Sequence, residues 1–479
     1  MAELLRIAPV ADRLGELFTG AGHELYLVGG SVRDALMGRL GHDLDFTTSA
    51  RPDDVEALLR EFVRGVPGGA VWDIGKEFGT IGVRVPTDGA LGEGAEDYWV
   101  IEVTTFRAEI YREDSRKPEV SYGDTIAGDL VRRDFTVNAM AIQLPERRFV
   151  DPHQGLRDLA NGLLRTPGTP QQSFSDDPLR MMRAARFTSQ LSTPGRAGVR
   201  FAPAPEVVAA MVDMAERIDI ISAERVRDEL SKLVLTDHPR PGLNLVVETG
   251  LAERVLPELP ALRLEVDEHH RHKDVYEHSM TVLEQSIALE KARGREPDLV
   301  ARLAALLHDI GKPRTRKFVD GNRVTFHHHD VVGAKLVNKR LQELRFSGEQ
   351  IKQIAKLVEL HLRFHGYSDG MFDDTRGWTD SAVRRYVRDA GDQLERLHIL
   401  TRADCTTRNQ RKAARLRRAY DDLERRIAEL AEQEELDAIR PDLNGDQIMA
   451  LLGVPPGPVV GRAYKLLLDA RMEQGPLGE

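Results

Sequence analysis

The stretch that decides the fold is LVGGSVRDALMGRLGHDLDFT, residues 27–47. A glycine pair, Gly29 and Gly30, precedes a helical pattern, and a strand pattern then carries Asp43 and Asp45. Alternate side chains of a strand point to the same face, so these two carboxylates share a face. Carboxylate oxygens suit one or two Mg²⁺ ions, and the backbone amides at the start of a helix favour phosphate. The stretch therefore predicts an α/β domain equipped for nucleotide chemistry.

Strand patterns continue on both sides of this stretch as far as about residue 151. The β-branched runs are ELYLVG, DLDFTT, TIGVRV, YWVIEVTTF, AMAIQL and RFVD, separated by glycine, proline and one amphipathic helix after Gly30. Residues 86–97, PTDGALGEGAED, predict an exposed hairpin loop. From about Asp158 onward, helical periodicity replaces the strand patterns. We expect an α/β head followed by helical regions, with the boundaries 1–161, 162–261, 262–406 and 407–479.

The composition sets the class of protein. The chain has 479 residues, of which 41% are hydrophobic and 30% charged, enough for several packed cores. Its one cysteine, Cys405, excludes an internal disulfide and suits a reducing cytosol. The net charge of -10 argues against indiscriminate nucleic-acid binding. Residues 1–18 carry no export signal, and no run reaches the roughly 20 apolar residues of a membrane-spanning helix. We expect a cytoplasmic multidomain enzyme without membrane contact.

A third carboxylate completes the predicted catalytic set. Glu102 lies in the apolar run WVIEVTTF, where a charge is costly unless it is paired or bound to metal. With Asp43 and Asp45 it would hold two Mg²⁺ ions that activate an attacking hydroxyl and stabilise a pyrophosphate leaving group. Alone, an Asp-x-Asp pair is more typical of a strand-edge turn, and Glu102 of a salt-bridged strand residue. The preceding Gly-Gly-Ser-x-Arg favours the catalytic interpretation.

Six motifs in order extend this pattern over residues 24–240. They are GGSVRDALMG, DLDFT, EVTTFR, RRDFTVNAMA, DPLRMMRAARF and SAERVRDEL. In this order they resemble the bacterial tRNA nucleotidyltransferase and poly(A) polymerase family. The resemblance implies an α/β nucleotidyltransferase head followed by an all-α neck, body and HD domain. It also implies that the enzyme adds the terminal CCA to tRNA without a template, using CTP and ATP and releasing pyrophosphate.

The same resemblance implies a nucleotide-binding set. Arg132 and Arg133 would contact phosphate, and Asp134 would accept a hydrogen bond from a ribose 2′-hydroxyl. By itself, such an Arg-Arg-Asp group is more often a surface ion-pair cluster. The complete set is Gly29, Gly30, Ser31, Arg33, Arg132, Arg133, Asp134, Asn138, Asp177, Arg180, Arg183 and Arg186.

Two members of this set would choose the base. Asp177 and Arg180 stand at i and i+3 of the predicted helix DDPLRMMRAARF and would project into one cleft. A carboxylate and a guanidinium together pair with the amino donor and ring-nitrogen acceptor of cytosine and adenine, whereas uracil reverses these groups. The alternative is an ordinary ion pair at a helix N-terminus. Asp176 stands where family members often have Glu, so its own role is open.

Two further segments would support specificity. The polar segment 107–125 predicts a flexible loop, in which Tyr111, Arg116 and Pro118 match the loop that helps change specificity from C to A in the relatives. In SAERVRDEL, Ser222 is a predicted N-cap, and Glu224 and Arg225 would brace the neck helices.

Histidine and aspartate gather in residues 272–404. The pair His308-Asp309 follows an apolar helix that would deliver it to a buried site. The order of the motifs HKDVYEHS, LLHDIGKP, FHHHD, LVELHLR and TRAD resembles the HD phosphohydrolase superfamily. The implied metal ligands are His278, His308, Asp309, His329, His361 and Asp404, with His327 and His328 as competitors of His329. Imidazole-rich ligation favours Mn, Ni, Fe or Zn. A water molecule bound to such an ion would hydrolyse a phosphoester.

Alternative functions remain open at this point. One is a poly(A) polymerase or an enzyme that adds only C or only A, although DIGKEFGTIGVRV lacks the basic run typical of bacterial poly(A) polymerases. Another is an HD nucleotide phosphohydrolase whose head only binds RNA. The basic helix RNQRKAARLRRAY after Cys405 would contact tRNA or be a solvated face. The expected partners are tRNA, CTP and ATP, and the oligomeric state is open.

Overall fold

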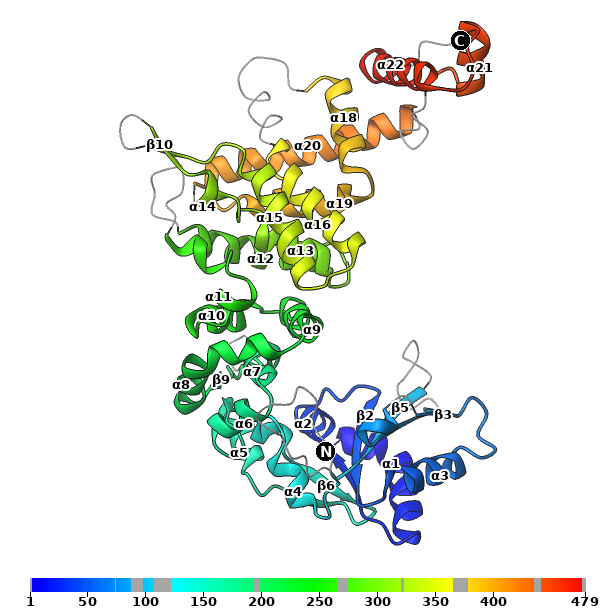
Figure 1. Ribbon diagram of the computed structural model, residues 1–479, viewed down its shortest axis with the longest axis vertical. Coiled ribbons are helices and arrows are strands. Elements are labelled where there is room, and N and C mark those ends of the chain that lie inside the picture. Colours follow the sequence, from blue (N-terminus) through cyan, green and yellow to red (C-terminus); the bar gives the residue numbers. More distant parts are fainter. Residues whose placement is uncertain are drawn as a thin grey trace. The chain divides into compact units, whose positions relative to one another are not determined.

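The computed structural model falls into two compact units (Figure 1). Unit 1 comprises Met1–Glu229 and Pro241–Arg254, and unit 2 comprises Leu230–Arg240 and Val255–Glu479. The structure describes residues 2–73, 75–87, 98–106, 122–192, 198–264, 274–319, 323–364, 378–407, 409–434 and 441–475.

A mixed seven-stranded sheet forms the head in unit 1. Its strand order is β3-β4-β5-β2-β1-β6-β7, in which β2 and β5 are parallel and the other neighbours antiparallel. The six predicted strands are confirmed, and β3 was not predicted. Antiparallel β4 and β5 pair up to Pro86 and Tyr98, so the predicted hairpin connects two strands. The strands are β1 Leu25–Val28, β2 Asp43–Thr48, β3 Ala70–Trp72, β4 Thr80–Pro86, β5 Tyr98–Thr105, β6 Ala141–Leu144 and β7 Arg148–Val150.

Helices cover this sheet. The helix after Gly30 is confirmed as α2, but α3 was not predicted. Helix α3 buries Val55, Leu59 and Phe62 at the i, i+4, i+7 spacing of one helical face and contacts β4 and β5. The head helices are α1 Ala2–Gly20, α2 Gly30–Leu36, α3 Pro52–Phe62, α4 Ile126–Val131 and α5 Gly155–Asn161, with the short 3₁₀ helices η1 Lys76–Phe78 and η2 Thr136–Asn138.

The chain continues from the head into helices, as predicted, with one break that differs. The predicted single helix DDPLRMMRAARF is two helices, because α6 ends at Asp176 and α7 begins at Leu179. Asp177 between them is extended, with φ -145° and ψ 98°. Pro178 explains the break, since a proline disfavours helical geometry in the residue before it. The helices are α6 Pro170–Asp176, α7 Leu179–Gln190, α8 Pro205–Met214, α9 Ala223–Val234, α10 Arg240–Glu248 and α11 Ala252–Val255, with η3 Ala215–Ile220 and the paired strands β8 Leu163–Leu164 and β9 Ala202–Pro203.

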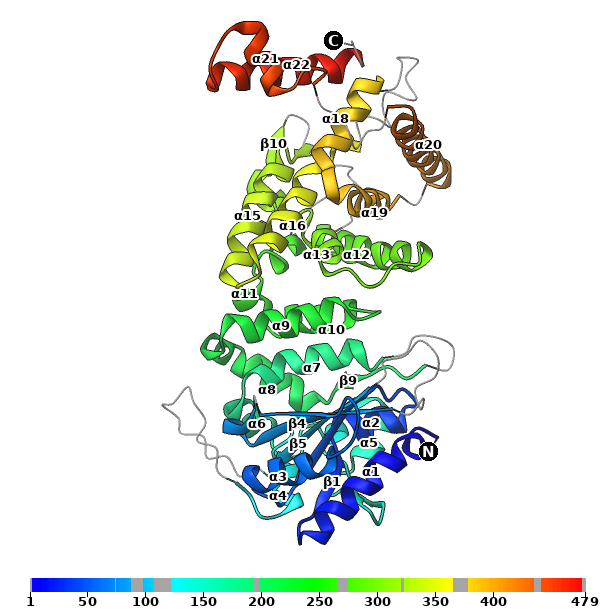
Figure 2. The ribbon, with the colours of Figure 1, turned by 90° about the vertical axis from the view of Figure 1, so that its right-hand side faces the viewer.

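Unit 2 is built around a bundle of five helices, α12, α13, α15, α16 and α19, which contact one another (Figure 2). Helix α13 is buried along almost its whole length, as its apolar sequence predicted. A small hairpin, β10–β11, interrupts the helical pattern and was not predicted. The elements are η4 Pro260–Leu264, α12 Val275–Ala292, α13 Leu299–Leu307, α14 Lys312–Thr315, β10 Lys317–Val319, β11 Arg323–Thr325, α15 His329–Glu343, α16 Gly348–Leu360, α18 Asp380–Ala390, η5 Gly391–Gln393, α19 Leu394–Asp404, α20 Gln410–Glu434, α21 Gly445–Leu452 and α22 Pro458–Gln474.

Within the described parts of both units, none of the helices combines the length and the apolar character needed to cross a membrane.

Candidate active site and metal centre

Three carboxylates lie on two neighbouring strands of the head. Asp43 and Asp45 are exposed on β2, while Leu44 between them is buried on the opposite face. Glu102 is exposed on the parallel strand β5, directly opposite Asp45 in the strand register. The parallel pairing of β2 with β5 therefore brings residues 57 positions apart in the sequence onto one face of the sheet, at its centre.

Their electrostatics favour a bound cation. Partial removal of water raises the pKa of Asp45, and the neighbouring Asp43 raises it further, while Arg133 opposes the shift. Burial also raises the pKa of Glu102, and Asp45 and Asp43 add to it. The carboxylates thus repel one another, and a divalent cation would relieve this repulsion. These three side chains are not among the groups of described residues whose ligand atoms all lie within 4.8 Å of one another.

The glycine turn adjoins these carboxylates. Gly29 has a φ of 66°, and a Cβ placed there would lie 2.7 Å from Nη1 of Arg133. The backbone geometry therefore favours glycine, and a larger residue would also push the Arg133 guanidinium aside. The backbone N–H of Asp45 donates to Oγ of Ser31 at 2.9 Å, which ties the start of α2 to β2. Arg133 is also paired with Asp129 at 3.0 Å. Backbone amides and a guanidinium thus lie beside the carboxylates of β2.

Asp134 lies at the centre of a buried network. Its Oδ2 accepts from Nε and Nη2 of Arg183 at 2.8 and 2.5 Å, and its Oδ1 accepts from Nδ2 of Asn138 at 2.9 Å. Oδ1 also accepts from the backbone N–H of Phe135 at 2.8 Å. Arg33 donates to Oδ1 of Asn138 at 2.5 Å. A carboxylate offers about four acceptor positions, so a ribose hydroxyl would have to replace one of these donors.

The arginine partners keep Asp134 ionised. Burial alone would raise the pKa of Asp134, but the Arg183 guanidinium and the Asn138 amide outweigh it and hold that pKa far below its usual range. Asp134 is therefore a fixed negative charge that orients Arg183.

Sequence analysis missed one residue of this network, Glu229. It is buried on α9 and accepts from Nε of Arg186 at 2.6 Å, while its other oxygen lies 3.8 Å from Nη1 of Arg183. Arg186 also lies over the ring of Phe187 at 4.1 Å. The sequence signal that could have identified Glu229 is its place in the helical motif SAERVRDEL, where a carboxylate stands at a position that faces the core.

The structure does not pair the two predicted base-reading residues with each other. Oδ2 of Asp177 is 2.8 Å from Nη2 of Arg225, which agrees with a bracing role for Arg225. Arg180 donates to Oγ of Ser173 at 2.8 Å and to the carbonyl of Arg132 at 2.5 Å. The expected i, i+3 relation within one helix is wrong, because Asp177 precedes α7.

The predicted specificity loop residues Tyr111, Arg116 and Pro118 lie outside the described residues.

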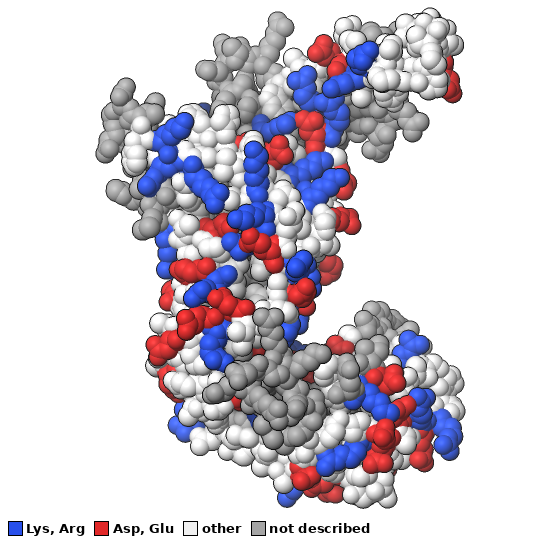
Figure 3. Space-filling view, viewed as in Figure 1, with Lys and Arg blue, Asp and Glu red and all other residues white. Residues whose placement is uncertain are grey.

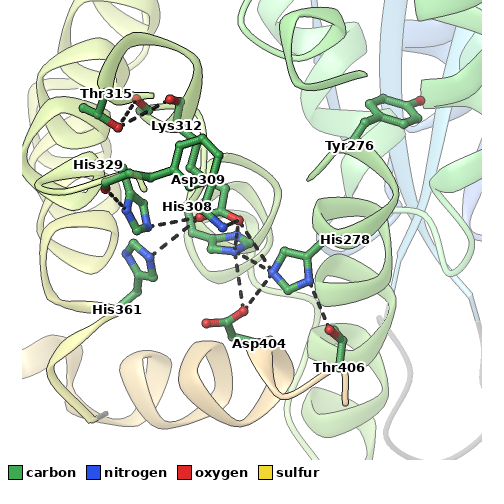
Figure 4. Close-up of polar contacts among 12 residues, drawn as sticks. Tyr276, His278, His308, Asp309, Lys312, Thr315, His329, His361, Asp404 and Thr406 are labelled. Atoms are coloured by element: carbon green, nitrogen blue, oxygen red, sulfur yellow. Dashed lines mark hydrogen bonds and ion pairs between the residues drawn. The ribbon is translucent and has the colours of Figure 1, made fainter. Parts of the chain in front are cut away.

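In unit 2, five helices converge on a cluster of imidazoles and carboxylates (Figure 4). His329, whose neighbours His327 and His328 are exposed, is the member of the histidine run that is buried in the cluster. The cluster consists of His278 on α12, His308 and Asp309 after α13, His329 at the start of α15, His361 after α16 and Asp404 at the end of α19.

The cluster divides into two groups whose ligand atoms lie within 4.8 Å of one another. The first is His278, His308 and Asp404, in which Nε2 of His278 is 2.9 Å from Oδ1 of Asp404. The second is Asp309, His329 and His361, in which Nε2 of His329 is 3.3 Å from Oδ1 of Asp309.

Asp309 faces both groups. Its Oδ2 lies 3.2 Å from Nε2 of His308, whereas its Oδ1 faces His329. One carboxylate thus contacts ligand atoms of both groups.

Backbone carbonyls orient the imidazoles. Nδ1 of His308, His329 and His361 each donates to the carbonyl three residues earlier, at 2.8, 2.8 and 2.6 Å. A carbonyl only accepts, so Nδ1 carries the proton and the Nε2 atoms face inward as potential ligands. The buried Nε2 atoms of His329 and His361 have no hydrogen-bond partner.

The charges of the cluster also fit a metal. Burial lowers the pKa of His308, but the Asp309 and Asp404 carboxylates reverse this and raise it to about 9. Burial and the charge of His308 lower the pKa of His361 to about 3. A proton on His308 therefore supplies positive charge that a divalent cation would otherwise provide, and His361 is neutral and can act as a ligand.

Sequence analysis also missed Lys312, which follows the HD pair by one turn. Its Nζ lies 3.0 Å from Oδ2 of Asp309 and 5.6 Å from the centre of the Phe326 ring.

Family comparisons match three successive parts of the chain. The family described as "Poly A polymerase head domain" matches residues 25–165, and "Probable RNA and SrmB- binding site of polymerase A" matches 200–262. The HD domain family matches residues 275–409.

Two curated relatives differ in how much of the chain they share. The A-adding tRNA nucleotidyltransferase of Deinococcus radiodurans is 33% identical over 93% of this chain and 91% of its own length. The CCA-adding enzyme of Levilactobacillus brevis is 40% identical over a region that covers 48% of this chain. That region covers about half (51%) of the relative's own length.

Solved structures share the fold. The Bacillus stearothermophilus CCA-adding enzyme in complex with CTP has a TM-score of 0.61 at 22% identity, covering 100% of this chain and 95% of that one. The Thermotoga maritima CCA-adding enzyme complexed with tRNA has a TM-score of 0.56 at 17% identity, covering 98% and 92%. At these identities the likeness shows the fold alone. The near full-length match to the Deinococcus relative shows more, and the chain belongs to the tRNA nucleotidyltransferase and poly(A) polymerase family.

Proposed function

We propose that this chain is a cytoplasmic enzyme that adds the 3′-terminal CCA to tRNA from CTP and ATP, without a template and with release of pyrophosphate. The observation that carries the proposal is the alignment of Asp43, Asp45 and Glu102 beside the Gly29 turn, in a chain with a near full-length tRNA nucleotidyltransferase relative. Solved relatives in complex with CTP, ATP or tRNA support the choice of substrates.

The head residues would divide the work of the transfer. Asp43, Asp45 and Glu102 would hold Mg²⁺, which when bound polarises the α-phosphate and activates the 3′-hydroxyl. Around Gly29, the backbone amides and Arg133 would hold the triphosphate. The hydrogen bond between Ser31 and the Asp45 amide keeps this turn against the acidic strand.

Base choice would rest on Asp177 and Arg180. Both side chains already have protein partners, Arg225 and Ser173 respectively. An incoming cytosine or adenine would therefore donate from its amino group to the Asp177 carboxylate, which Arg225 orients, and its ring nitrogen would replace Ser173 as an acceptor for Arg180. Uracil offers the reverse pattern and would leave polar groups unpaired, which disfavours it.

The products of the wild-type enzyme test this function. Transfer RNA that lacks CCA is incubated with Mg²⁺ and CTP or ATP, singly and together. CCA addition predicts two added C residues with CTP alone and a complete CCA with both nucleotides. Absence of any incorporation, or long adenosine tails, would contradict the proposal.

A second candidate, addition of A alone, is favoured by the name of the near full-length relative. The same assay separates it when a tRNA ending in CC is included. An A-adding enzyme extends only the tRNA ending in CC and ignores CTP, whereas a CCA-adding enzyme extends both substrates.

For the HD centre we propose a metal-dependent phosphohydrolase. His278, His308 and Asp404 would hold one ion and His329 and His361 a second, with Asp309 between them. Mn, Ni, Fe or Zn suits these imidazole ligands and when bound makes a water molecule nucleophilic near neutral pH. Lys312 would hold the phosphoryl oxygens beside Asp309.

Metal analysis of purified variants tests the HD centre. His329→Ala removes one inward Nε2, so its metal content falls below that of the wild type. His327→Ala changes an exposed neighbour in the same run and is the matched control, with metal content unchanged. Equal metal in all three proteins would mean that His329 is a structural core residue.

A further inference from the structure

A basic and aromatic surface adjoins the HD centre. Arg314 on α14 and the neighbouring Arg316, Lys317 and Phe318 are all exposed, and we name these four residues the α14–β10 platform. Phe318 is 67% exposed although it is a large apolar side chain. The Arg316 guanidinium lies 5.3 Å from the centre of the Phe318 ring. Figure 3 shows Lys and Arg side chains gathered beside α14 and β10.

The platform is anchored to the histidine and aspartate cluster of the HD centre at both of its ends. At the start of α14, Lys312 lies 3.0 Å from Asp309. At the other end, β10 pairs with β11, and the chain then reaches Phe326, whose carbonyl accepts from Nδ1 of His329 at 2.8 Å. The platform therefore lies in the connection between two ligands of one centre and is tethered to that centre at both ends.

The chemistry of the platform selects a class of ligand. One exposed phenylalanine is common on protein surfaces and indicates nothing by itself. An exposed ring beside a guanidinium, with two further cations along the same short segment, matches a single-stranded polynucleotide, whose bases stack while successive phosphates meet the cations. A free mononucleotide would need only one stacking surface and one cation.

We infer that the α14–β10 platform binds a single-stranded polynucleotide and presents its phosphorylated end to the HD centre. This inference rests on the proposed phosphohydrolase function and names its substrate class. In the reaction the oxygen of water bonds to phosphorus, and the bond from phosphorus to the sugar oxygen breaks. The sugar oxygen takes the proton that water loses.

Photocrosslinking to the full-length protein tests where the strand lies. The probe is a short single-stranded RNA that ends in a 3′-phosphate and carries 4-thiouridine next to that end. The phosphate prevents the probe from serving as a primer for the head. Mass spectrometry is expected to find the crosslink in the peptide that contains residues 314–318. Crosslinks confined to unit 1 would overturn the inference.

Substitutions then distinguish binding at the platform from non-specific attraction to positive charge. Arg316→Ala is expected to reduce the crosslink at least several-fold and to lower the slope of log affinity against log salt by about 0.7, the value for one phosphate contact on a single strand. Phe318→Leu keeps an apolar side chain but removes stacking, so it is also expected to weaken the crosslink. Lys339→Ala removes an exposed cation of α15 that lies outside the platform, and is the matched control with an unchanged crosslink.

Activity measurements distinguish failure of this inference from failure of the phosphohydrolase proposal. Arg316→Ala is expected to lower kcat/KM for the 3′-phosphorylated RNA and to leave hydrolysis of a 3′-phosphorylated mononucleotide unchanged. An equal loss on both substrates would overturn the inference. If the metal-loaded wild type hydrolyses neither substrate, both the phosphohydrolase function and the presentation of a phosphorylated end are contradicted. A crosslink that depends on the platform residues would still support binding of the strand.

Discussion

At the scale of single residues, Gly29 has two separate reasons to be glycine. Its φ of 66° is left-handed, and a Cβ would approach Arg133 to 2.7 Å. Gly38 shares the first reason alone, with a φ of 71° and no atom within 4 Å of its Cβ position. The two glycines therefore form a natural pair that separates backbone strain from site chemistry.

Gly29→Ala and Gly38→Ala should each cost about 1–3 kcal/mol, because alanine disfavours a positive φ, and Gly29, with a ψ of -131°, lies in a region that is almost restricted to glycine. Gly29→Ala should in addition lower nucleotide incorporation by at least tenfold, because the new methyl group displaces Arg133 from the turn. Thermal unfolding and incorporation rates of both variants check this. Equal losses of incorporation rate in the two variants would show that the position of Arg133 at this turn does not affect nucleotide transfer.

Asp134 makes a prediction about pH. Its pKa is held below the ordinary value of about 3.9 by Arg183, so its contribution to stability is complete above that value and is lost as the pH falls toward the folded-state pKa. At pH 7, Asp134→Asn should cost about 3 kcal/mol, as expected for a buried ion pair that loses one charge. Urea unfolding should show this difference shrinking below about pH 4. A difference that is constant with pH would contradict the ionised state of Asp134.

At the scale of elements, local pattern predicted most of the head. The six strands were recognisable because β-branched runs are separated by glycine and proline, and the hairpin between β4 and β5 followed from its loop composition. Helix α3 carried a clear apolar spacing and was overlooked. Strand β3 has only three half-buried residues, too few for a periodic signal.

The sequence also contained the signal for the break between α6 and α7, which was not predicted. Pro178 restricts Asp177 to extended geometry, yet the apolar periodicity on both sides suggested one continuous helix. The ion pair of Asp177 with Arg225 was beyond sequence reasoning, because it joins residues 48 positions apart.

This pair leads to a prediction for α9. Arg225→Ala removes an ion pair at a half-exposed side chain, so stability should change by less than about 1 kcal/mol. Selection of C and A over U should weaken, because the Asp177 carboxylate loses the cation that orients it. Arg227→Ala, on the same helix and paired with Asp228, is the control and should keep wild-type selectivity. Equal selectivity in both variants would remove Arg225 from the base-reading site.

At the scale of the whole molecule, the described residues include a carboxylate cluster in unit 1 and a cluster of imidazoles and carboxylates in unit 2. The candidate residues of both clusters were named from motif order, because each motif contains its own ligands. The sequence did not predict which contacts these side chains make. Four donors hydrogen-bond to Asp134, the buried Glu229 lies between two arginines, and Asp309 contacts both imidazole groups. These contacts join distant segments and depend on tertiary packing.

We assign the nucleotidyl transfer to Asp43, Asp45 and Glu102 on β2 and β5. The direct measurement is incorporation of labelled CMP and AMP into tRNA lacking CCA by Asp45→Asn, with His308→Ala as the variant of the other cluster. Asp45→Asn should lose activity by on the order of 10³-fold or more while still binding tRNA, and His308→Ala should incorporate at the wild-type rate. Normal incorporation by Asp45→Asn would contradict the account.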